Sequence, residues 1–237
     1  MKTLSLFILL SVSLIAVKGQ KLKNILNTIT SKTTGSDAAG GDISDGLKQA
    51  LEVGTQRGLE KLSGVDGFFA DAAIKILMPE EAKKVEQKLR AAGFGSQVDN
   101  AILSMNRAAE DAAKSATPVF VNAIRQMSFQ DAMGILRGGD FAATGYLKNK
   151  TSTQLTTAFR PIIQQSLEKV NATKYWNTIF SNYNKFSFNK VNPDIEAYVT
   201  EKALSGIFYQ LGLEEQKIRK DPAARTTDLL KKVFSTK

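Results

Sequence analysis

Two glutamates of this chain fall on predicted helix faces that are otherwise apolar. Glu110 ends the stretch MNRAAE at residues 105–110, and Glu215 continues an apolar stripe in the last long helix. Burial makes a carboxyl group harder to ionise in general, and a protonated carboxyl group can serve as a general acid. Buried carboxylates are more often halves of ion pairs, and Arg219 follows Glu215 by one helical turn. Both interpretations stay open at this point.

Four more polar residues accompany these glutamates. The six candidate site residues are Asn106, Arg107, Glu110, Asp131, Glu215 and Arg219. We expect them to converge as one buried, paired network that joins the middle of the chain to its last helix. Removing a partner from a structural network destabilises the protein, whereas a catalytic carboxylate can often be removed without loss of stability.

The composition excludes most familiar catalytic sites. The 237 residues include no His and no Cys. Disulfides, thiolate nucleophiles, Ser-His-Asp triads and zinc sites with nitrogen or sulfur ligands are therefore ruled out. No phosphate-binding loop or dinucleotide fingerprint is present. We predict no cofactor and no metal site.

The N-terminus has the pattern of a secretory signal peptide. Lys2 precedes an apolar run over residues 4–17, which is shorter than the roughly 20 residues that a membrane-spanning helix needs. We expect residues 1–19 to be removed and residues 20–42, which are rich in Ser, Thr and Gly, to form a flexible tether. The expected location is the periplasm, without a lipid anchor on cysteine and without a later transmembrane segment.

The net charge is basic. Removing Lys2 and Lys18 with the leader lowers the formal charge from +9 to +7. Export argues against nucleic acid as the partner, so an anionic component of the cell envelope is one candidate. Plain solubility is the alternative, because basic and acidic residues are interspersed along the chain.

The apolar residues recur at helical spacing along the body of the chain. One narrow stripe consists of Val98, Ile102, Met105, Ala109, Ala112 and Ala116, and another of Ile43, Leu47, Leu51, Gly54, Gly58 and Leu62. Gly54 and Gly58 predict a close helix crossing. We find no strand alternation. The predicted fold is all-α, with residues 43–237 forming a single compact domain of roughly eight to ten helices.

Turn and capping residues predict where these helices begin and end. Four prolines are expected at helix starts, namely Pro79, Pro118, Pro193 and Pro222. Pro161 falls inside a helical pattern and predicts a kink. Residues 151–154 and 128–131 resemble capping boxes, and Gly138 predicts a helix end.

Aromatic residues are concentrated in the segment YWNTIFSNYNKFSF at residues 175–188. Such a cluster can line a ligand groove or lie at a lipid interface. Trp176, Ile179, Phe180 and Tyr183 share one helical face, which favours packing in the core.

The order and spacing of many short motifs resemble an uncharacterised exported bacterial family, domain of unknown function 4197. The matching motifs include MNRAAE at 105–110, Gly138-Gly139-Asp140, Ala142-Ala143-Thr144, Phe159-Arg160-Pro161-Ile162, Ala203-Leu204-Ser205-Gly206, Glu214-Glu215 and Ile218-Arg219. The resemblance covers about residues 43–234. It implies an exported protein with one helical domain, and it implies no particular activity.

Two functions remain from different classes. The first is a non-enzymatic binding or envelope-interaction module, because no catalytic constellation rises above chance. The second is a hydrolase or lyase that acts on cell-wall glycan through a carboxylate alone. A deep cleft with a glutamate at its floor would favour the enzyme, and a closed bundle would favour the binding module.

Overall fold

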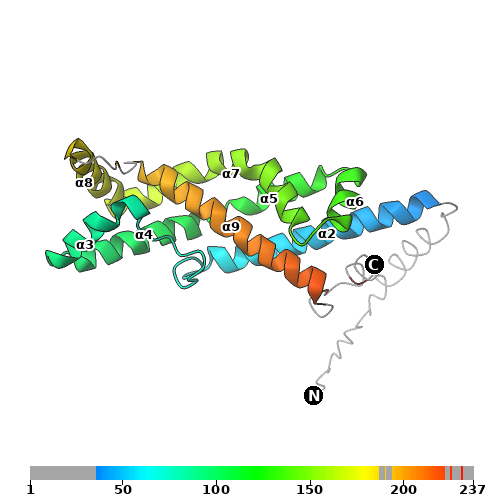
Figure 1. Ribbon diagram of the computed structural model, residues 1–237. Coiled ribbons are helices and arrows are strands. Elements are labelled where there is room, and N and C mark those ends of the chain that lie inside the picture. Colours follow the sequence, from blue (N-terminus) through cyan, green and yellow to red (C-terminus); the bar gives the residue numbers. More distant parts are fainter. Residues whose placement is uncertain (1–35, 187–189, 191–193, 222–224, 226–230, 232–237) are drawn as a thin grey trace, which may run out of the picture. The chain divides into compact units, whose positions relative to one another are not determined.

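All regular elements in the described part of the chain are helices. The computed structural model describes residues 36–186, 190, 194–221, 225 and 231. The chain divides into units of residues 1–40 and 41–237, and the second unit is described here together with residues 36–40, which begin its first helix. Its helices, shown in Figure 1, are α2 (Ser36–Ser63), the 3-10 helix η1 (Glu80–Ala82), α3 (Lys83–Ala91), α4 (Gly95–Ala113), α5 (Ala116–Arg125), α6 (Phe129–Arg137), α7 (Ala142–Glu168), α8 (Ala172–Phe186) and α9 (Ile195–Lys220). This confirms the predicted all-α fold.

The N-terminal predictions lie largely outside the described residues. The expected leader, residues 1–19, is not among them, nor are residues 20–35. Helix α2 begins at Ser36, so helical structure extends into the segment that was expected as a tether. Ser36 and Asp37 are typical of a helix start, and alanines follow them. Across the described residues, no helix combines the length and the apolar character needed to span a bilayer.

Helices α4, α7 and α9 pack on one another and enclose most of the core. The predicted stripe of α4, which continues into Ala116, is buried along its whole length, from Val98 to Ala116. Its alanines leave room for neighbouring helices to approach closely. This prediction is therefore confirmed.

The glycines of α2 lie where α9 crosses it. A methyl group at Gly54 would lie 3.3 Å from Cδ1 of Ile218, and one at Gly58 would lie 3.2 Å from Cδ2 of Leu211. Both distances are shorter than comfortable carbon contacts. The predicted close crossing is present, and α9 is the helix that makes it.

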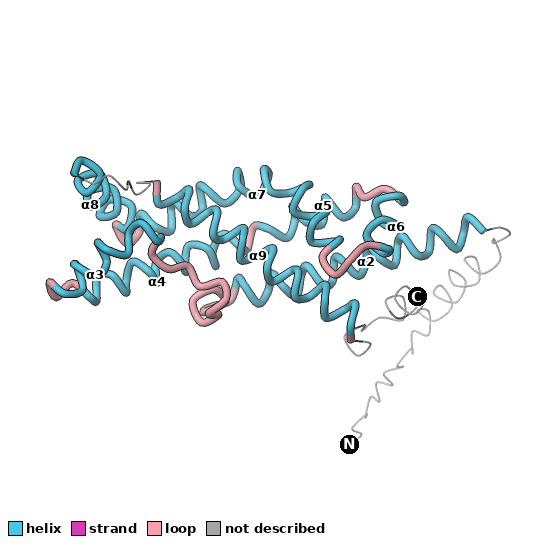
Figure 2. Tube along the Cα trace, viewed as in Figure 1, coloured by secondary structure: helices cyan, strands magenta, loops and turns pink. Residues whose placement is uncertain are grey.

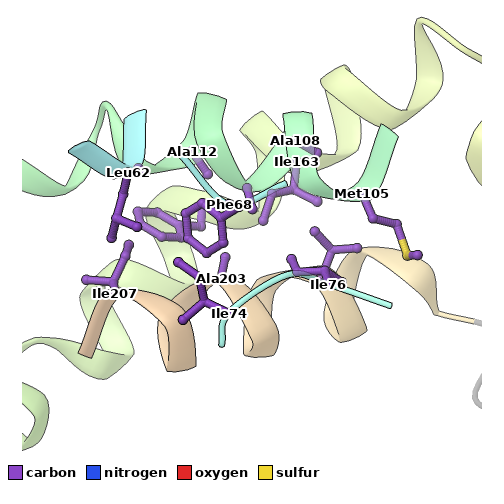
Figure 3. Packing of buried hydrophobic residues seen from close by; sticks show 14 of the residues in the cluster. Leu62, Phe68, Ile74, Ile76, Met105, Ala108, Ala112, Ile163, Ala203 and Ile207 are labelled. Carbon is purple, nitrogen blue, oxygen red and sulfur yellow. The ribbon is translucent and has the colours of Figure 1, made fainter. Parts of the chain in front are cut away.

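The longest irregular stretch in the described chain joins α2 to η1 over residues 64–79 (Figure 2). Phe68 anchors it in the core, between Ala112 of α4 and Ala203 of α9 (Figure 3). Gly206 makes room for this ring, because a methyl group there would lie 2.5 Å from Cε1 of Phe68. The loop is therefore built into the helix packing.

Most predicted helix ends are present and one is misplaced. Pro79 immediately precedes η1 and Pro118 lies in the first turn of α5, while Pro193 and Pro222 lie outside the described residues. Pro161 lies inside α7, as expected. Helix α6 ends at Arg137, directly before Gly138.

The predicted capping box at residues 151–154 is wrong, because these residues lie inside α7. The Thr151 hydroxyl donates to the Leu147 carbonyl at 2.6 Å, and the Ser152 hydroxyl donates to the Lys148 carbonyl at 2.6 Å. Hydroxyl groups that bond back to the preceding turn are compatible with a continuous helix.

The second predicted capping box is present at the start of α6. The Ser128 hydroxyl accepts from the Asp131 amide at 3.1 Å, and the Asp131 carboxylate accepts from the Ser128 amide at 3.0 Å. We predict that Ser128→Ala lowers the free energy of unfolding by about 1 kcal/mol, measured by denaturant titration. Ser96→Ala is the control, because Ser96 is exposed in the first turn of α4 and no side-chain hydrogen bond reaches it within the described residues, so it should have the smaller effect.

The aromatic segment packs inward where its side chains are described. Trp176 and Phe180 of α8 are buried, and their ring centroids lie 4.4 Å apart. Tyr183 is partly buried against the same core, and the side chain of Ile179 lies outside the described ones. The described rings therefore pack in the core, and they do not line a ligand groove.

Candidate functional site

Glu110 fixes the beginning of the loop 64–79. Its Oε1 accepts from the amides of Phe68 and Phe69, at 3.1 and 3.2 Å. Its Oε2 accepts from Arg107 at 2.6 Å, and Arg107 reaches on to Asp66 at 2.7 Å. The carboxylate is buried and both of its oxygens are occupied. Glu110 therefore connects the loop to α4 through hydrogen bonds. We call a buried glutamate of this kind, with the arginine and the amides that it binds, a bracket.

Asn106 fixes the same loop one helical turn earlier on α4. Its Oδ1 accepts from the Ile76 amide at 2.9 Å, and its Nδ2 donates to the Ile76 carbonyl at 2.8 Å. A second bond from Nδ2 reaches the Ile102 carbonyl at 2.7 Å. The side chain is fully buried, and it pairs with Ile76 as a neighbouring strand would. The MNRAAE helix thus holds the loop at both ends.

Glu215 likewise accepts hydrogen bonds from backbone amides, here at the start of α7. Its Oε1 accepts from the Ala143 amide at 2.9 Å, and its Oε2 accepts from the Thr144 amide and hydroxyl, each at 2.8 Å. These amides belong to the first turn of α7, where Phe141 offers no side-chain cap. Because first-turn amides lack partners within their own helix, a carboxylate from α9 satisfies them.

Arg219 completes this second bracket. Its Nε and Nη2 donate to Oε1 of Glu215, at 2.9 and 2.8 Å, and both side chains are about 7% exposed. Nη2 also donates to the Ile135 carbonyl in α6 at 2.8 Å. The pair therefore joins α9 to the end of α6 and to the start of α7.

The six candidates do not form the single network that we expected. The hydrogen bonds of the described residues place Asn106, Arg107 and Glu110 at the loop 64–79, and Glu215 with Arg219 at the start of α7. Asp131 belongs to the capping box of α6. The physical reason is that each buried carboxylate is fully used by the backbone amides and the arginine beside it.

A groove of about 790 Å³ lies between the loop 64–79 and α9. One wall is formed by residues 73–81 and the other by a stripe of α9 with Tyr198, Glu201, Lys202, Ser205, Gly206 and Tyr209. Lys190 contributes from the segment before α9. Neither Glu110 nor Glu215 lines it. The two brackets therefore build the scaffold, and a different set of residues faces the groove.

Tyr198 is the most constrained polar group in this groove. Its hydroxyl donates to the Leu77 carbonyl at 2.8 Å. Burial raises the pKa of Tyr198 to about 12, and the negative charges of Glu81, Glu201 and Glu80 add to this effect. The Lys202 ammonium lies 5.6 Å from the centre of its ring. At neutral pH the phenol stays protonated and holds the loop in place.

An alkaline titration should resolve this phenol. We predict that tyrosine absorbance shows one ionisation at a pKa of about 12, because burial and the nearby carboxylates disfavour the ionised phenol. Tyr198→Phe should remove this step, and Tyr209→Phe should leave it in place. Circular dichroism at each pH verifies that the chain is folded, and a folded chain without the step would contradict the geometry.

Sequence reasoning missed the groove. Ile74, Ile76 and Met78 are buried, while Lys75 is half-buried and Leu77 is exposed. This is an alternation of burial and not of residue type, because the exposed Leu77 is apolar like its buried neighbours, so the sequence itself showed no apolar–polar alternation there. The segment is too short and too isolated to form a sheet, so the all-α fold class is unaffected.

The fold and the groove define an all-helical domain with one irregular loop packed against its last long helix. The chain belongs to the family described as Protein of unknown function (DUF4197), whose model matches residues 37–235. The resemblance seen in the sequence motifs is therefore confirmed. Comparison with curated proteins finds no match, and comparison with solved structures finds none either.

Proposed function

We propose that this chain is an exported, non-enzymatic binding module that holds its ligand in the groove between residues 73–81 and α9. The observation that carries the proposal is the groove itself, with its volume of about 790 Å³. Its loop wall is fixed from behind by Glu110 and Asn106. A preorganised wall reduces the entropy lost when a ligand binds.

The chemistry of the lining supports binding rather than turnover. Lys75, Lys190 and Lys202 face the groove together with Glu80, Glu81 and Glu201. Tyr198 is engaged with the Leu77 carbonyl, so it is not a free proton donor. Such a mixed lining can orient a polar ligand through several charged contacts.

The location proposed for this module is the periplasm, and the support for it is the apolar run over residues 4–17 that follows Lys2. An anionic envelope component stays a candidate partner because the chain is basic. The three lysines and three glutamates that line the groove suit a ligand that carries both negative and positive charge.

The groove can be tested with a label because the chain has no cysteine of its own. Tyr209→Cys places one thiol on the groove at a position that is 47% exposed, and Val170→Cys places one outside the groove at a position that is 51% exposed. Each variant carries an environment-sensitive dye. The probes are soluble peptidoglycan fragments, phosphatidylglycerol vesicles and a library of short peptides.

A saturable dye response to one probe in Tyr209→Cys, without a response in Val170→Cys, is the expected result. No response to any probe would overturn the proposal.

The alternative function is a hydrolase or lyase acting on cell-wall glycan. Glu81 and Glu201 favour it, because both line the groove and no ion pair reaches either of them within the described residues. The enzyme would release soluble fragments from purified peptidoglycan, and Glu81→Gln or Glu201→Gln would abolish the release. The binding module should release none.

A further inference from the structure

After a turn in which the amides of Ile74 and Lys75 donate to the Asp71 carbonyl, residues 75–79 lie on the helices like an isolated strand. Ile74 and Ile76 point into the core beside α9 (Figure 3), and Leu77 between Ile76 and Met78 is 52% exposed. One edge of this segment is already paired, because Asn106 bonds both the amide and the carbonyl of Ile76. The side chain of Asn106 thus occupies the place of a partner strand.

The opposite edge faces the groove. The amide and carbonyl of one residue in an extended chain point to the same edge, and the Leu77 carbonyl accepts from Tyr198 of α9. Across the described part of the chain, no hydrogen bond reaches the Leu77 amide or the Lys75 carbonyl. These two groups lie on the same edge, since residues two apart in a strand share their direction. An added strand would satisfy both.

The groove has the length for such a strand. On α9, the stripe from Tyr198 to Tyr209 extends over about 16 Å at 1.5 Å per residue. An extended peptide rises about 3.3 Å per residue, so the stripe matches about five residues. On the loop side, Ile74 lies beside Gly206 and Leu77 beside Tyr198, so the two walls run alongside each other.

The carboxylates at one end of the groove determine which peptides it prefers. Glu81 and Glu201 act on Tyr198 electrostatically and therefore lie at the Leu77 end. Glu80 already pairs with Lys83 at 2.7 Å, whereas no ion pair reaches Glu81 or Glu201 within the described residues. Lys202 also lies at this end, 5.6 Å from the centre of the Tyr198 ring, so these two carboxylates face one ammonium group and favour a basic side chain on the ligand.

We propose that the groove binds an extended peptide that carries a basic side chain and adds as a strand to the edge of Lys75 and Leu77. This inference rests on the proposed function and names its ligand class. Main-chain hydrogen bonds supply the attraction that does not depend on sequence, and Glu81 with Glu201 supplies the preference for positive charge. The ligand is a polypeptide segment of another molecule, in contrast to a glycan or a lipid.

The test selects peptides from a random nine-residue library on the mature chain and measures their affinity with the dye on Tyr209→Cys. Each selected peptide is then N-methylated at one amide at a time, which removes a donor from the ligand without altering the protein. We expect a loss of at least tenfold at one amide, the one that donates to the Lys75 carbonyl, and little loss at its neighbours, because Tyr198 already donates to the Leu77 carbonyl on this edge. The selected peptides should contain Lys or Arg.

The charge preference is tested on the protein side. Glu201→Gln should weaken a basic peptide about tenfold, while Glu60→Gln on the exposed face of α2 should leave its affinity unchanged. Melting curves of both variants report whether they are folded.

Three outcomes separate this inference from the proposed function. N-methyl sensitivity at a single amide together with the effect of Glu201→Gln supports strand addition. If the dye on Tyr209→Cys responds only to peptidoglycan fragments or vesicles, strand addition is overturned and the binding module still stands. Peptide binding that no N-methyl group weakens has the same meaning. If the dye responds to none of the probes, both strand addition and the proposed binding function are overturned.

Discussion

Glu215→Ala is expected to lower the free energy of unfolding by about 3–5 kcal/mol. The substitution leaves the amides of Ala143 and Thr144 without their acceptor and removes the carboxylate that pairs with the buried guanidinium of Arg219. Removing one half of a buried ion pair is among the most destabilising single changes that a substitution can cause. Denaturant titration followed by circular dichroism measures the change.

Glu214→Ala is the matched control, because Glu214 precedes Glu215 on the same helix and its one hydrogen bond within the described residues is a long one to Gln210, at 3.4 Å. It should change the stability by less than about 0.5 kcal/mol. An unchanged or raised melting temperature for Glu215→Ala would contradict the structural role and would make this glutamate the first candidate for catalysis.

Glu110→Ala is the second large effect that we expect, again about 3–5 kcal/mol of lost stability. Here the amides of Phe68 and Phe69 lose their acceptor, and Arg107 keeps only Asp66. Because Arg107 is partly exposed, water can solvate it, so the loss should lie toward the lower end of that range. Thermal and denaturant melts measure it.

Two comparisons distinguish the brackets. Asp99→Ala removes an exposed carboxylate from the same helix as Glu110 and should change the stability by less than about 1 kcal/mol. Glu110→Ala should also weaken binding in the groove because it frees the loop wall, whereas Glu215→Ala should not. Equal effects of the two glutamate substitutions on binding would contradict the assignment of the brackets to different places.

The helical fold was predictable because its signals are local. The stripe from Val98 to Ala116 and the spacing of Gly54 and Gly58 identify helix faces without any knowledge of their partners. Ser128 and Asp131 form a capping box within four residues. Such signals depend on helical periodicity and on the unsatisfied amides of a helix start, and both can be read from neighbouring residues.

The site was less predictable because its partners are distant in the chain. Sequence identified Glu110 and Glu215 as unusual, but it contained nothing to show that their oxygens accept from backbone amides 41 to 72 residues away. Backbone amides have no sequence signature. The pairing of Glu215 with Arg219 was the exception, since a spacing of four residues on one helix makes it local.

The groove was missed for a related reason. Its loop wall contributes main-chain groups rather than unusual side chains, and its α9 wall consists of residues that are ordinary on a helix surface. The alternating burial of residues 74–78 was not visible in the sequence, because the exposed Leu77 is apolar like the buried Ile76 and Met78.

Amide hydrogen exchange over residues 66–78, in the wild-type chain and in Glu110→Ala, tests most directly whether the MNRAAE helix builds the wall of the groove. The wild-type amides of Phe68, Phe69 and Ile76 should be protected, since buried acceptors hold them. In Glu110→Ala, protection should fall over this segment while α7 keeps its own. Protection that is unchanged over residues 66–78 in a folded Glu110→Ala variant would contradict the account.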